Sequence, residues 1–434
     1  MIWNENAECM SRDKMRELQG IRLKRTVEKV YQNCVPYRQQ MTEKGITPND
    51  IKSIEDIAKL PFTSKKDLRD NYPFGLLCCQ MSNVVRIHAS SGTTGKPIVV
   101  GYTRNDLNIW NEVGARCFSA YGINRNDTVQ VSYGYGLFTG GLGAHSAVET
   151  FGGTVIPISS GNTEKQIMLM HDLKTTALAC TPSYALYLAE ALEQSPYNRK
   201  EFKLKTGVFG AEPWTEGMRK ELEDKLQIKA YDIYGLTEII GPGVGHECRC
   251  QNGTHICEDH FYPEIVDPET GNPLPEGQTG ELVFSTITKS GMPLLRFRTR
   301  DLTKLNYKKC DCGRTSVRME KILGRCDDML IIRGVNVFPS QIETVICEIP
   351  ELEPHYLITV DRETNNLDTF EVKVEVKENH YCDEMGKMLE LKKHIAHKLQ
   401  NVLGILPNLK LVEPKSIQRS QGKAKRVVDN RKLK

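Results

Sequence analysis

The chain has 434 residues, a formal net charge of +3, 39% hydrophobic residues and 26% charged residues, which is typical of a soluble globular protein with two or three domains. The nearly balanced charge argues against nucleic-acid binding through bulk charge. Because no run of about 18 apolar residues and no basic-then-apolar N-terminal segment occurs, the sequence predicts neither a transmembrane helix nor a signal peptide. We therefore expect a cytoplasmic protein without nucleic-acid or membrane partners.

The first hundred residues predict helices followed by two strands that flank a polar loop. Apolar side chains recur at helical spacing through residues 11–45, which predicts two helices, and Ser64 can cap a short helix that follows. Apolar runs at residues 84–89 and 98–102 predict strands. The loop between the strands consists of glycine, hydroxyl and cationic residues before a proline: Ser90, Ser91, Gly92, Thr93, Thr94, Gly95, Lys96 and Pro97.

This loop has the chemistry of an anion site. Glycines let the backbone turn tightly, and consecutive N–H groups form a concave surface suited to phosphate. The loop differs from the P-loop pattern Gly-x-x-x-x-Gly-Lys-Ser/Thr, because Ser90 replaces its first glycine and Pro97 its final hydroxyl residue. An ordinary Ser/Gly hairpin turn is the alternative, but the density of donors favours a phosphate-binding loop of another kind.

From Thr103, a candidate helix cap, to about residue 233, strand and helix patterns alternate. Strands are predicted at residues 128–132, 154–158, 176–180, 206–209 and 228–233, and helices at residues 140–151, 163–173, 182–192 and 215–226. This alternation predicts a parallel sheet covered by helices.

The pattern changes after about residue 255. Strand-like segments at residues 260–267, 280–288 and 294–299, separated by Gly and Pro turns, predict a small antiparallel β subdomain or barrel. A small α+β domain follows, predicted from a β-rich stretch at 329–337, a helix at 341–349 capped by Ser340, strands at 357–360 and 370–376, and a helix at 383–403.

Six short motifs follow the phosphate loop: residues 133–136, 209–213, 231–238, 298–301, 324–328 and 421–426. Each alone is weakly informative. In this order and spacing they resemble the acyl-adenylate-forming superfamily over nearly the whole chain. Residues 133–141, 258–265 and 328–339 are similar to the phenylacetate–CoA ligases within that superfamily.

The resemblance implies an α/β fold with an N-terminal adenylation domain at residues 1–324, which combines parallel sheets, helices and an antiparallel β subdomain at about 245–324. A hinge at about 325–328 and a mobile α+β C-terminal domain at 328–434 would follow. The implied reaction is ATP-dependent ligation of an aryl-acetic acid, with phenylacetate as first candidate, to coenzyme A. The carboxylate attacks the α-phosphate to give an acyl-adenylate and pyrophosphate, and the CoA thiol then displaces AMP. Mg²⁺ is the implied cofactor, phenylacetate catabolism the implied setting, and a homodimer a candidate assembly.

The resemblance also assigns roles to single residues. Lys423 would bridge the carboxylate and the α-phosphate, Thr237 would contact the α-phosphate, and Glu238 would bind Mg²⁺. Asp301 would accept both ribose hydroxyls, and Arg325 would add a ribose contact. The remaining contacts to ATP or AMP would come from Ser90, Ser91, Gly92, Thr93, Thr94, Gly95, Lys96, Gly210, Ala211, Glu212, Pro213, Asp232, Tyr234 and Gly235.

The hinge, the acyl pocket and the tail complete the expected machinery. Asp327 matches the family's hinge residue. Candidates for a flat apolar acyl pocket combine small and aromatic side chains, although core packing is the alternative for each: Tyr133, Tyr135, Gly136, Phe138, Gly141 and Ala211. On charge alone the basic tail beyond Lys410 would be a nucleic-acid arm, with Lys423 a solvated lysine. The balanced overall charge and the motif around Lys423 favour ATP and CoA phosphates.

Five of the 14 cysteines lie close together in the sequence or in one predicted subdomain: Cys248, Cys250, Cys257, Cys310 and Cys312. A reducing cytosol argues against a disulfide framework. The turn from Cys310 to Cys312 can direct two thiolates to one point, and Cys248 with His255 would complete a closed tetrahedral Zn²⁺ site. Cys250 and Cys257 are alternate ligands, and plain thiols or a redox pair are the competing interpretations.

Two other functions compete with the ligase. One is an adenylating synthetase that acts on another carboxylate or coenzyme substrate without forming a thioester. The other is a non-catalytic nucleotide-binding or zinc-dependent interaction protein. The presence of Lys423, Glu238 and Asp301 argues against the second, because a degenerate copy would be expected to lose at least one of them.

Overall fold

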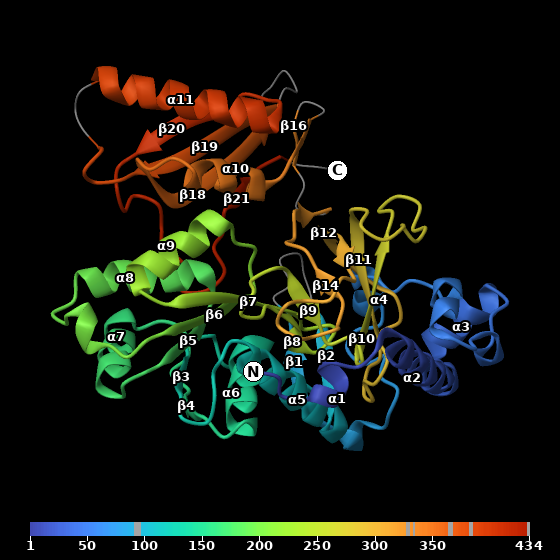
Figure 1. The fold of residues 1–434 in the computed structure, drawn as a ribbon. Helices are drawn as coiled ribbons and strands as arrows, with labels where there is room; N and C mark the ends of the chain where they lie inside the picture. The colour runs from blue at the N-terminus through green and yellow to red at the C-terminus, as the bar shows by residue number, and fades with distance from the viewer. Residues whose placement is uncertain (91–96, 327–329, 333–334, 363–367, 382–384, 432–434) are drawn as a thin grey trace. The chain divides into compact units, whose positions relative to one another are not determined.

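The computed structural model describes residues 1–90, 97–326, 330–332, 335–362, 368–381 and 385–431 (Figure 1). They divide into two compact units. The first comprises Met1–Cys180, Tyr197–Ala211 and Lys229–Lys321, and the second comprises Thr181–Pro196, Glu212–Ile228 and Ile322–Lys434. The second unit therefore takes in two helix-bearing segments from the middle of the chain. None of the helices in the described residues is both long and apolar enough to cross a membrane.

A mixed sheet dominates the first unit. In the described residues it has the strand order β13-β14-β9-β8-β7-β6-β5-β3-β4. The five strands from β7 to β4 are parallel, and the other four continue the sheet in antiparallel fashion. The bounds are β3 Thr128–Val131, β4 Thr154–Ile156, β5 Ala177–Cys180, β6 Thr206–Gly210, β7 Lys229–Leu236, β8 Gly241–His246, β9 Thr254–Ile256, β13 Leu305–Asn306 and β14 Arg318–Met319.

The antiparallel region predicted from the sequence is thus divided between two sheets. One part extends the parallel sheet, because a tight turn after β7 reverses the chain and pairs Ile233 with His246. The other part is a separate antiparallel sheet of β10 Phe261–Val266, β11 Gly280–Thr286 and β12 Phe297–Thr303. A hairpin of β1 Val84–Ala89 and β2 Val99–Thr103 flanks the predicted phosphate loop.

The helices of the first unit begin at the capping residues that the sequence indicated. Thr103 accepts a hydrogen bond from the Asp106 backbone N–H, and Ser64 accepts one from that of Asp67; in both cases the aspartate completes a capping box. The apolar faces of α5 and α6 and the parallel strands share one buried core. The bounds are α1 Glu5–Glu8, α2 Arg12–Asn33, α3 Val35–Glu43, α4 Lys65–Asp70, α5 Arg104–Ala120, α6 Thr139–Thr150 and α7 Thr163–Asp172.

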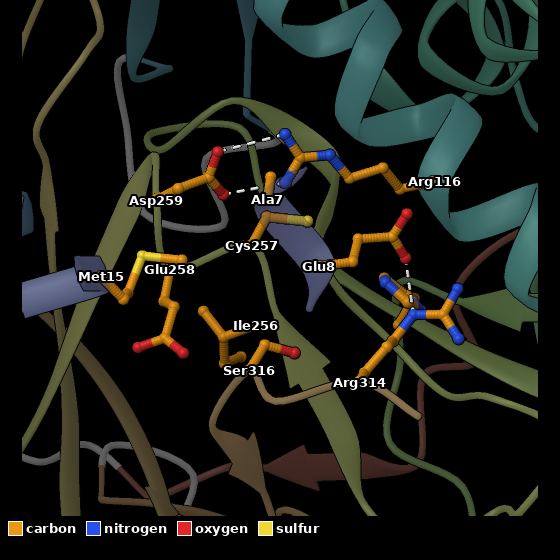
Figure 2. A pocket seen from close by; sticks show the side chains of 11 residues that line it. Ala7, Glu8, Met15, Arg116, Ile256, Cys257, Glu258, Asp259, Arg314 and Ser316 are labelled. Atoms are coloured by element: carbon orange, nitrogen blue, oxygen red, sulfur yellow. Dashed lines mark hydrogen bonds and ion pairs between the residues drawn. The ribbon is translucent and has the colours of Figure 1, made fainter. Parts of the chain in front are cut away.

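Buried ion pairs attach the N-terminal segment and α5 to the antiparallel strands (Figure 2). The guanidinium of Arg116 donates to both oxygens of Asp259, at 2.8 and 3.1 Å, and Arg314 donates to Glu8 at 2.6 Å. These side chains line a cavity of about 10 Å³, which has room for roughly one water molecule. The cavity is therefore too small for an organic substrate, and the cluster is structural.

The second unit carries the α+β fold predicted for the end of the chain. Its four-stranded sheet has the order β20-β19-β18-β21 in the described residues, and α10 and α11 share a core with it. The sequence-based assignment of Ser340 as a helix cap is wrong, because Pro339 occupies the first helical position and Phe338 is the N-cap. The bounds are α8 Pro182–Glu193, α9 Glu216–Leu226, β15 Gly324–Arg325, β16 Leu330–Ile332, β17 Val335–Val337, α10 Pro339–Cys347, β18 Leu352–Arg362, β19 Asp368–Val376, α11 Met385–Leu403, β20 Asn408–Val412 and β21 Val427–Asp429.

Candidate functional site

The turn that follows β7 carries Thr237 and Glu238, which were predicted to act at the phosphates. Both are buried, at 6% and 4% exposure. The hydroxyl of Tyr102 donates to the Thr237 carbonyl at 2.8 Å, and the ammonium of Lys289 donates to the Glu238 carbonyl at 2.9 Å. The ammonium also lies 5.0 Å from the centre of the Tyr102 ring. Two side chains from distant segments therefore hold the backbone of this turn.

Lys289 is itself a buried cation. Burial lowers its pKa to about 8, although the carboxylates of Asp106 and Glu238 favour the charged form. Asp106 also accepts hydrogen bonds from the backbone N–H groups of Ser290 and Gly291, at 2.5 and 2.9 Å. The segment that carries Lys289 is thus fixed on the first turn of α5.

Two further contacts place the predicted nucleotide residues of the first unit close together. The hydroxyl of Tyr234, in β7, donates to the Asp301 carboxylate of β12 at 2.6 Å. The hydroxyls of Thr237 and Thr139 lie 3.2 Å apart, which joins the turn to the first residue of α6. The predicted ribose and α-phosphate contacts therefore lie near the end of one strand, β7.

Glycine is required at the ends of β6 and β7, where the backbone of the neighbouring strand comes close. A Cβ on Gly210 would lie 2.1 Å from the Ile233 carbonyl, and one on Gly235 would lie 1.9 Å from that of Gly241. Ala211 follows with a φ of 72°, a left-handed conformation that is uncommon for alanine. These residues therefore form a tight backbone surface at the end of β6 and β7. Asp232 lies two residues before Tyr234 and is half-buried; its backbone N–H donates to Glu247 at 2.8 Å.

The base of the predicted phosphate loop is fixed, although residues 91–96 lie outside the described residues. The Ser90 N–H donates to the Ile98 carbonyl at 2.9 Å, and the Ala89 N–H donates to the Leu137 carbonyl at 2.8 Å. The structure thus brings the start of this loop beside the stretch predicted to contact the acyl group.

The acyl-pocket candidates are mostly neighbours. Tyr133 belongs to the core beneath α6, and three partly buried candidates pack against that core: Tyr135, Phe138 and Ala211. Gly141 lies in α6, where an added Cβ would be 2.8 Å from the Gly134 carbonyl. Gly136 is exposed, with a φ of 134°.

A histidine that the sequence did not assign lies beside these candidates. The hydroxyl of Tyr135 is 3.2 Å from Nδ1 of His145, and His145 Nε2 is 3.1 Å from a Glu149 carboxylate oxygen. The apolar candidates therefore have a polar pair at one edge.

The second unit holds the other predicted site residues. Lys423 is exposed on the loop before β21, and Pro213 is exposed before α9. The carboxylate of Glu212 accepts hydrogen bonds from the backbone N–H groups of Ser183 and Ala424. Arg325 lies in β15, and Asp327 falls outside the described residues.

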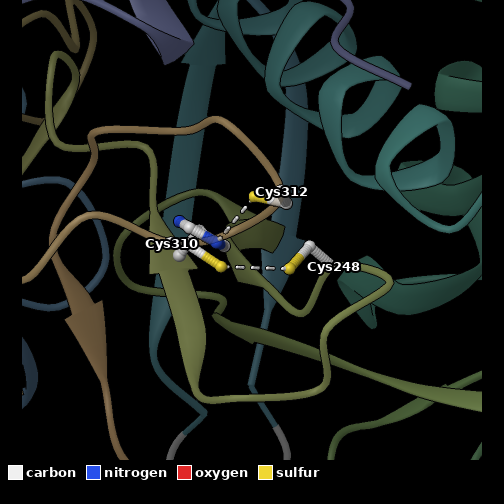
Figure 3. Close-up of side chains that lie close together, drawn as sticks. Cys248, Cys310 and Cys312 are labelled. Carbon is white, nitrogen blue, oxygen red and sulfur yellow. Dashed lines mark hydrogen bonds between the residues drawn. The ribbon is translucent and has the colours of Figure 1, made fainter.

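Four of the metal-ligand candidates converge (Figure 3). One ligand atom from each of Cys248, His255, Cys310 and Cys312 lies within 4.8 Å of every other. The sulfurs of Cys248 and Cys310 are 3.7 Å apart, and the Cys312 sulfur is 3.5 Å from His255 Nε2. Ligands around tetrahedral Zn²⁺ would be separated by roughly 3.5–3.8 Å, given Zn–S near 2.3 Å and Zn–N near 2.0 Å. The spacing and the donor set therefore fit Zn²⁺.

The surroundings also suit a metal site. His255 Nδ1 lies 3.0 Å from the Ser316 hydroxyl, which orients the ring with Nε2 toward the sulfurs. The Cys250 backbone N–H donates to the Cys248 sulfur at 3.4 Å, and the Arg314 guanidinium donates to that of Cys312 at 3.7 Å. The alternate ligands Cys250 and Cys257 stand outside the cluster formed by the described residues.

Sequence reasoning missed Tyr102 and Lys289. The sequence predicts Tyr102 only as the end of an apolar strand and Lys289 only as part of a loop between strands. The one available signal was a lysine, Lys289, in the otherwise uncharged segment Thr286–Leu294. That signal does not show which carbonyl the lysine binds.

Comparison with known proteins agrees with this arrangement. Residues 22–289 match the family model of the AMP-binding enzyme, and residues 334–431 match that of the AMP-binding enzyme C-terminal domain. The chain is 50% identical to the phenylacetate-coenzyme A ligase of Thermus thermophilus over the full length of both proteins. It is 49% identical to that of Escherichia coli, covering 98% of this chain and 97% of that protein.

Solved structures give the same picture. A crystal structure of 2-hydroxyisobutyryl-CoA ligase, in the postadenylation state with an acyl-AMP, aligns with a TM-score of 0.93 at 28% identity, over 99% of this chain and 92% of that one. A structure of the same enzyme in the thioesterification state, with the acyl-AMP and CoA, aligns with a TM-score of 0.74 at 29% identity, over 99% and 93%.

Tyr102→Phe is expected to lower the free energy of unfolding by about 1–3 kcal/mol, because the buried Thr237 carbonyl loses its donor. Urea unfolding measures the change. Tyr31→Phe, at a half-buried position on α2, is the matched control and should change the free energy by less than about 0.5 kcal/mol. Equal effects of the two substitutions would contradict a specific role for the Tyr102 hydroxyl.

Proposed function

The chain belongs to the AMP-binding enzyme family, and from that membership we propose that it is an AMP-forming acid–thiol ligase that joins an aryl-acetic acid, first of all phenylacetate, to coenzyme A. An oxygen of the acid attacks the α-phosphorus of ATP, and pyrophosphate leaves. The CoA sulfur then attacks the acyl carbon, and AMP leaves with the oxygen that joined it to the acyl group. The observation that carries the proposal is the identity of about one half, over essentially the whole chain, to ligases named for phenylacetate.

The turn after β7 suits the first half-reaction. Negative charge develops on phosphate oxygens as pyrophosphate leaves, so catalysis depends on fixed donors and cations. Thr237 would donate to the α-phosphate from a backbone that Tyr102 and Lys289 hold in place. A carboxylate oxygen is a ligand that Mg²⁺ prefers, and Mg²⁺ usually retains phosphate oxygens and water as its other ligands. Glu238 would supply that carboxylate, and the ion would offset phosphate charge.

The nucleoside would lie along the ends of β6 and β7. Asp301 would accept the ribose hydroxyls, and the hydrogen bond from Tyr234 at 2.6 Å orients its carboxylate. The backbone from Gly210 to Ala211 would lie against the adenine, where the missing side chain of Gly210 permits close approach.

The acid would lie against the apolar group of Tyr133, Tyr135, Phe138 and Ala211. Aromatic walls and small residues suit a flat ring. Discrimination between close aryl acids would be modest, because one methylene in an apolar pocket changes binding by only about 1–3 kcal/mol. The polar Tyr135–His145 pair would favour an acid whose ring carries a polar group at its far edge.

We also propose a structural Zn²⁺ ion, held by Cys248, His255, Cys310 and Cys312. Four protein ligands leave no open coordination position for substrate, so the ion would stabilise the fold and take no part in the chemistry. Arg314 connects this site to the N-terminus, because it contacts both the Cys312 sulfur and Glu8. The ion would therefore hold the first residues of the chain on the antiparallel strands.

The proposed function is tested by pyrophosphate release and thioester formation with ATP and Mg²⁺, across a panel of aryl acids with and without CoA. We expect a CoA-dependent thioester and AMP, with phenylacetate ahead of benzoate and the indole and hydroxyphenyl relatives. Pyrophosphate release without any thioester would instead support an adenylating synthetase. A failure of every acid to react would contradict the ligase.

Lys423→Ala is expected to slow adenylation by about 10²–10³-fold, because one cation that offsets the developing phosphate charge is removed. ATP–pyrophosphate exchange measures this step. Thioester formation from supplied phenylacetyl-adenylate should remain. Lys425→Ala is the control and should leave both steps unchanged. A folded Lys423→Ala protein that loses both half-reactions equally would rule out the assigned role.

Protein prepared without chelators is expected to contain about one Zn²⁺ ion per chain, as a closed four-ligand site requires, measured by inductively coupled plasma mass spectrometry. Cys310→Ser should lose the ion and unfold at lower temperature, whereas Cys250→Ser should keep it. Equal zinc loss in both variants, or a wild-type protein without zinc, would contradict the proposed ligand set.

A further inference from the structure

The carboxylate of Glu212 joins two separate backbone segments of the second unit. Its Oε1 accepts a hydrogen bond from the Ser183 N–H at 2.7 Å, and its Oε2 accepts one from the Ala424 N–H at 2.8 Å. Ser183 is the second residue of α8, and Ala424 directly follows Lys423. One side chain therefore ties the neighbour of Lys423 to the beginning of a helix.

The beginning of α8 is a favourable place for this carboxylate. The first N–H groups of a helix have no acceptor within the helix, and the dipole makes this end positive. Pro182 lacks an N–H, and the Tyr184 N–H donates to the Thr181 hydroxyl at 3.3 Å. Glu212 accepts from the Ser183 N–H between them, and its charge strengthens that hydrogen bond.

Thr181 holds the other side of Lys423. Its hydroxyl donates to the Gly422 carbonyl at 3.1 Å. Within the loop, the Ser420 hydroxyl donates to the Lys423 carbonyl at 2.9 Å and accepts from the Gly422 N–H at 3.2 Å. Both neighbours of Lys423 are thus fixed by side chains at or near the start of α8, while the Lys423 side chain is exposed.

A buried ion-pair network docks the preceding part of the loop. Arg419 contacts Glu190 of α8 at 3.0 Å and Glu375 of β19 at 2.8 Å, and His355 Nε2 lies 2.7 Å from Glu190. This network brings the loop to α8 as a whole. The contacts of Glu212 and Thr181 act at Lys423 itself.

We propose that Glu212 is a positioning residue that holds Lys423 in place for adenylation and releases it before thioester formation. This rests on the role of Lys423 in the proposed function. Both hydrogen bonds of the carboxylate end on backbone N–H groups, and Glu212 is half-exposed. Release of the loop therefore exchanges one N–H donor, that of Ala424, for water without burying an unpaired charge. The similar 2-hydroxyisobutyryl-CoA ligase has been crystallised in both a postadenylation and a thioesterification state.

The test compares Glu212→Gln with Asp224→Asn, which removes the same charge from an exposed position on α9. Glutamine has one acceptor and brings an amide donor against the second N–H, so at least one contact is lost. We expect Glu212→Gln to reduce the maximal rate of ATP–pyrophosphate exchange about tenfold to a hundredfold, because one or two charged hydrogen bonds are lost. This fold-change corresponds to about 1.4–2.8 kcal/mol at 25 °C. The KM for ATP should change little, and turnover of supplied phenylacetyl-adenylate with CoA should be unchanged or faster.

A second measurement does not depend on activity. Hydrogen exchange of the peptide that covers residues 420–426 should be faster in Glu212→Gln than in the wild type and in Asp224→Asn. An unchanged exchange rate there would overturn the proposal even if the wild-type enzyme turned over no acid. A raised KM for ATP with an unchanged maximal rate would also overturn it, because that result assigns the carboxylate to the adenine. Glu212→Asp, which keeps both acceptors on a shorter side chain, should restore part of the exchange activity.

Discussion

The turn at the end of β7 must satisfy its carbonyl groups without water, and this requirement organises the first unit. Buried carbonyls need donors, and here the donors are side chains from distant segments: the Tyr102 hydroxyl from β2 and the Lys289 ammonium from the loop after β11. The same hydrogen bonds fix where Thr237 and Glu238 point. Asp106 extends the arrangement, since it completes the capping box of α5 and holds the backbone next to Lys289. The placement of the proposed phosphate contacts thus follows from the need to give these buried carbonyls donors.

A second set of buried charges holds the antiparallel region against α5 and the N-terminal segment of this unit. Arg116 pairs with Asp259 across the cavity of Figure 2, and Arg314 reaches Glu8 and the Met1 carbonyl while it contacts the Cys312 sulfur. Such pairs are costly to leave incomplete, so they specify one arrangement more than they add net stability. In the proposed holoprotein, the thiolates of the metal site and this ion-pair network would share Arg314. Loss of the ion would therefore be felt at the N-terminus as well as at the zinc ligands.

The sequence was sufficient to predict those helices and strands that depend on local patterns. The alternating strands and helices from Thr103 to Ile233 follow from hydrophobic period and capping, and Thr103 and Ser64 cap their helices as expected. Pairing between distant segments was not predictable: nothing in the sequence of β8 shows that it extends the parallel sheet beside β7. For the same reason Lys289 was missed, because its partner is a carbonyl 51 residues away. The sequence named the pool of metal ligands, and only the fold showed that Cys250 and Cys257 stand apart from the other four.

The contacts in the second unit suggest how Lys423, in its proposed role, would be both held and released. The loop of Lys423 contacts α8 through short polar groups, with Glu212 and Thr181 next to the lysine and Arg419 farther along. The hydrogen bond from the Ala424 N–H to the half-exposed Glu212 carboxylate exchanges with water at small net cost, unlike a large apolar contact. Thr181 and Glu375, the partner of Arg419, are buried and hold the loop more firmly, and all three contacts define its position sharply because each has a direction. A reaction in which one lysine must act at the first step and withdraw at the second requires this combination. In the proposed ligase, the directional polar contacts around Lys423 would therefore specify one position of its loop. The half-exposed contact at Glu212 would also allow the loop to leave, because water can replace it.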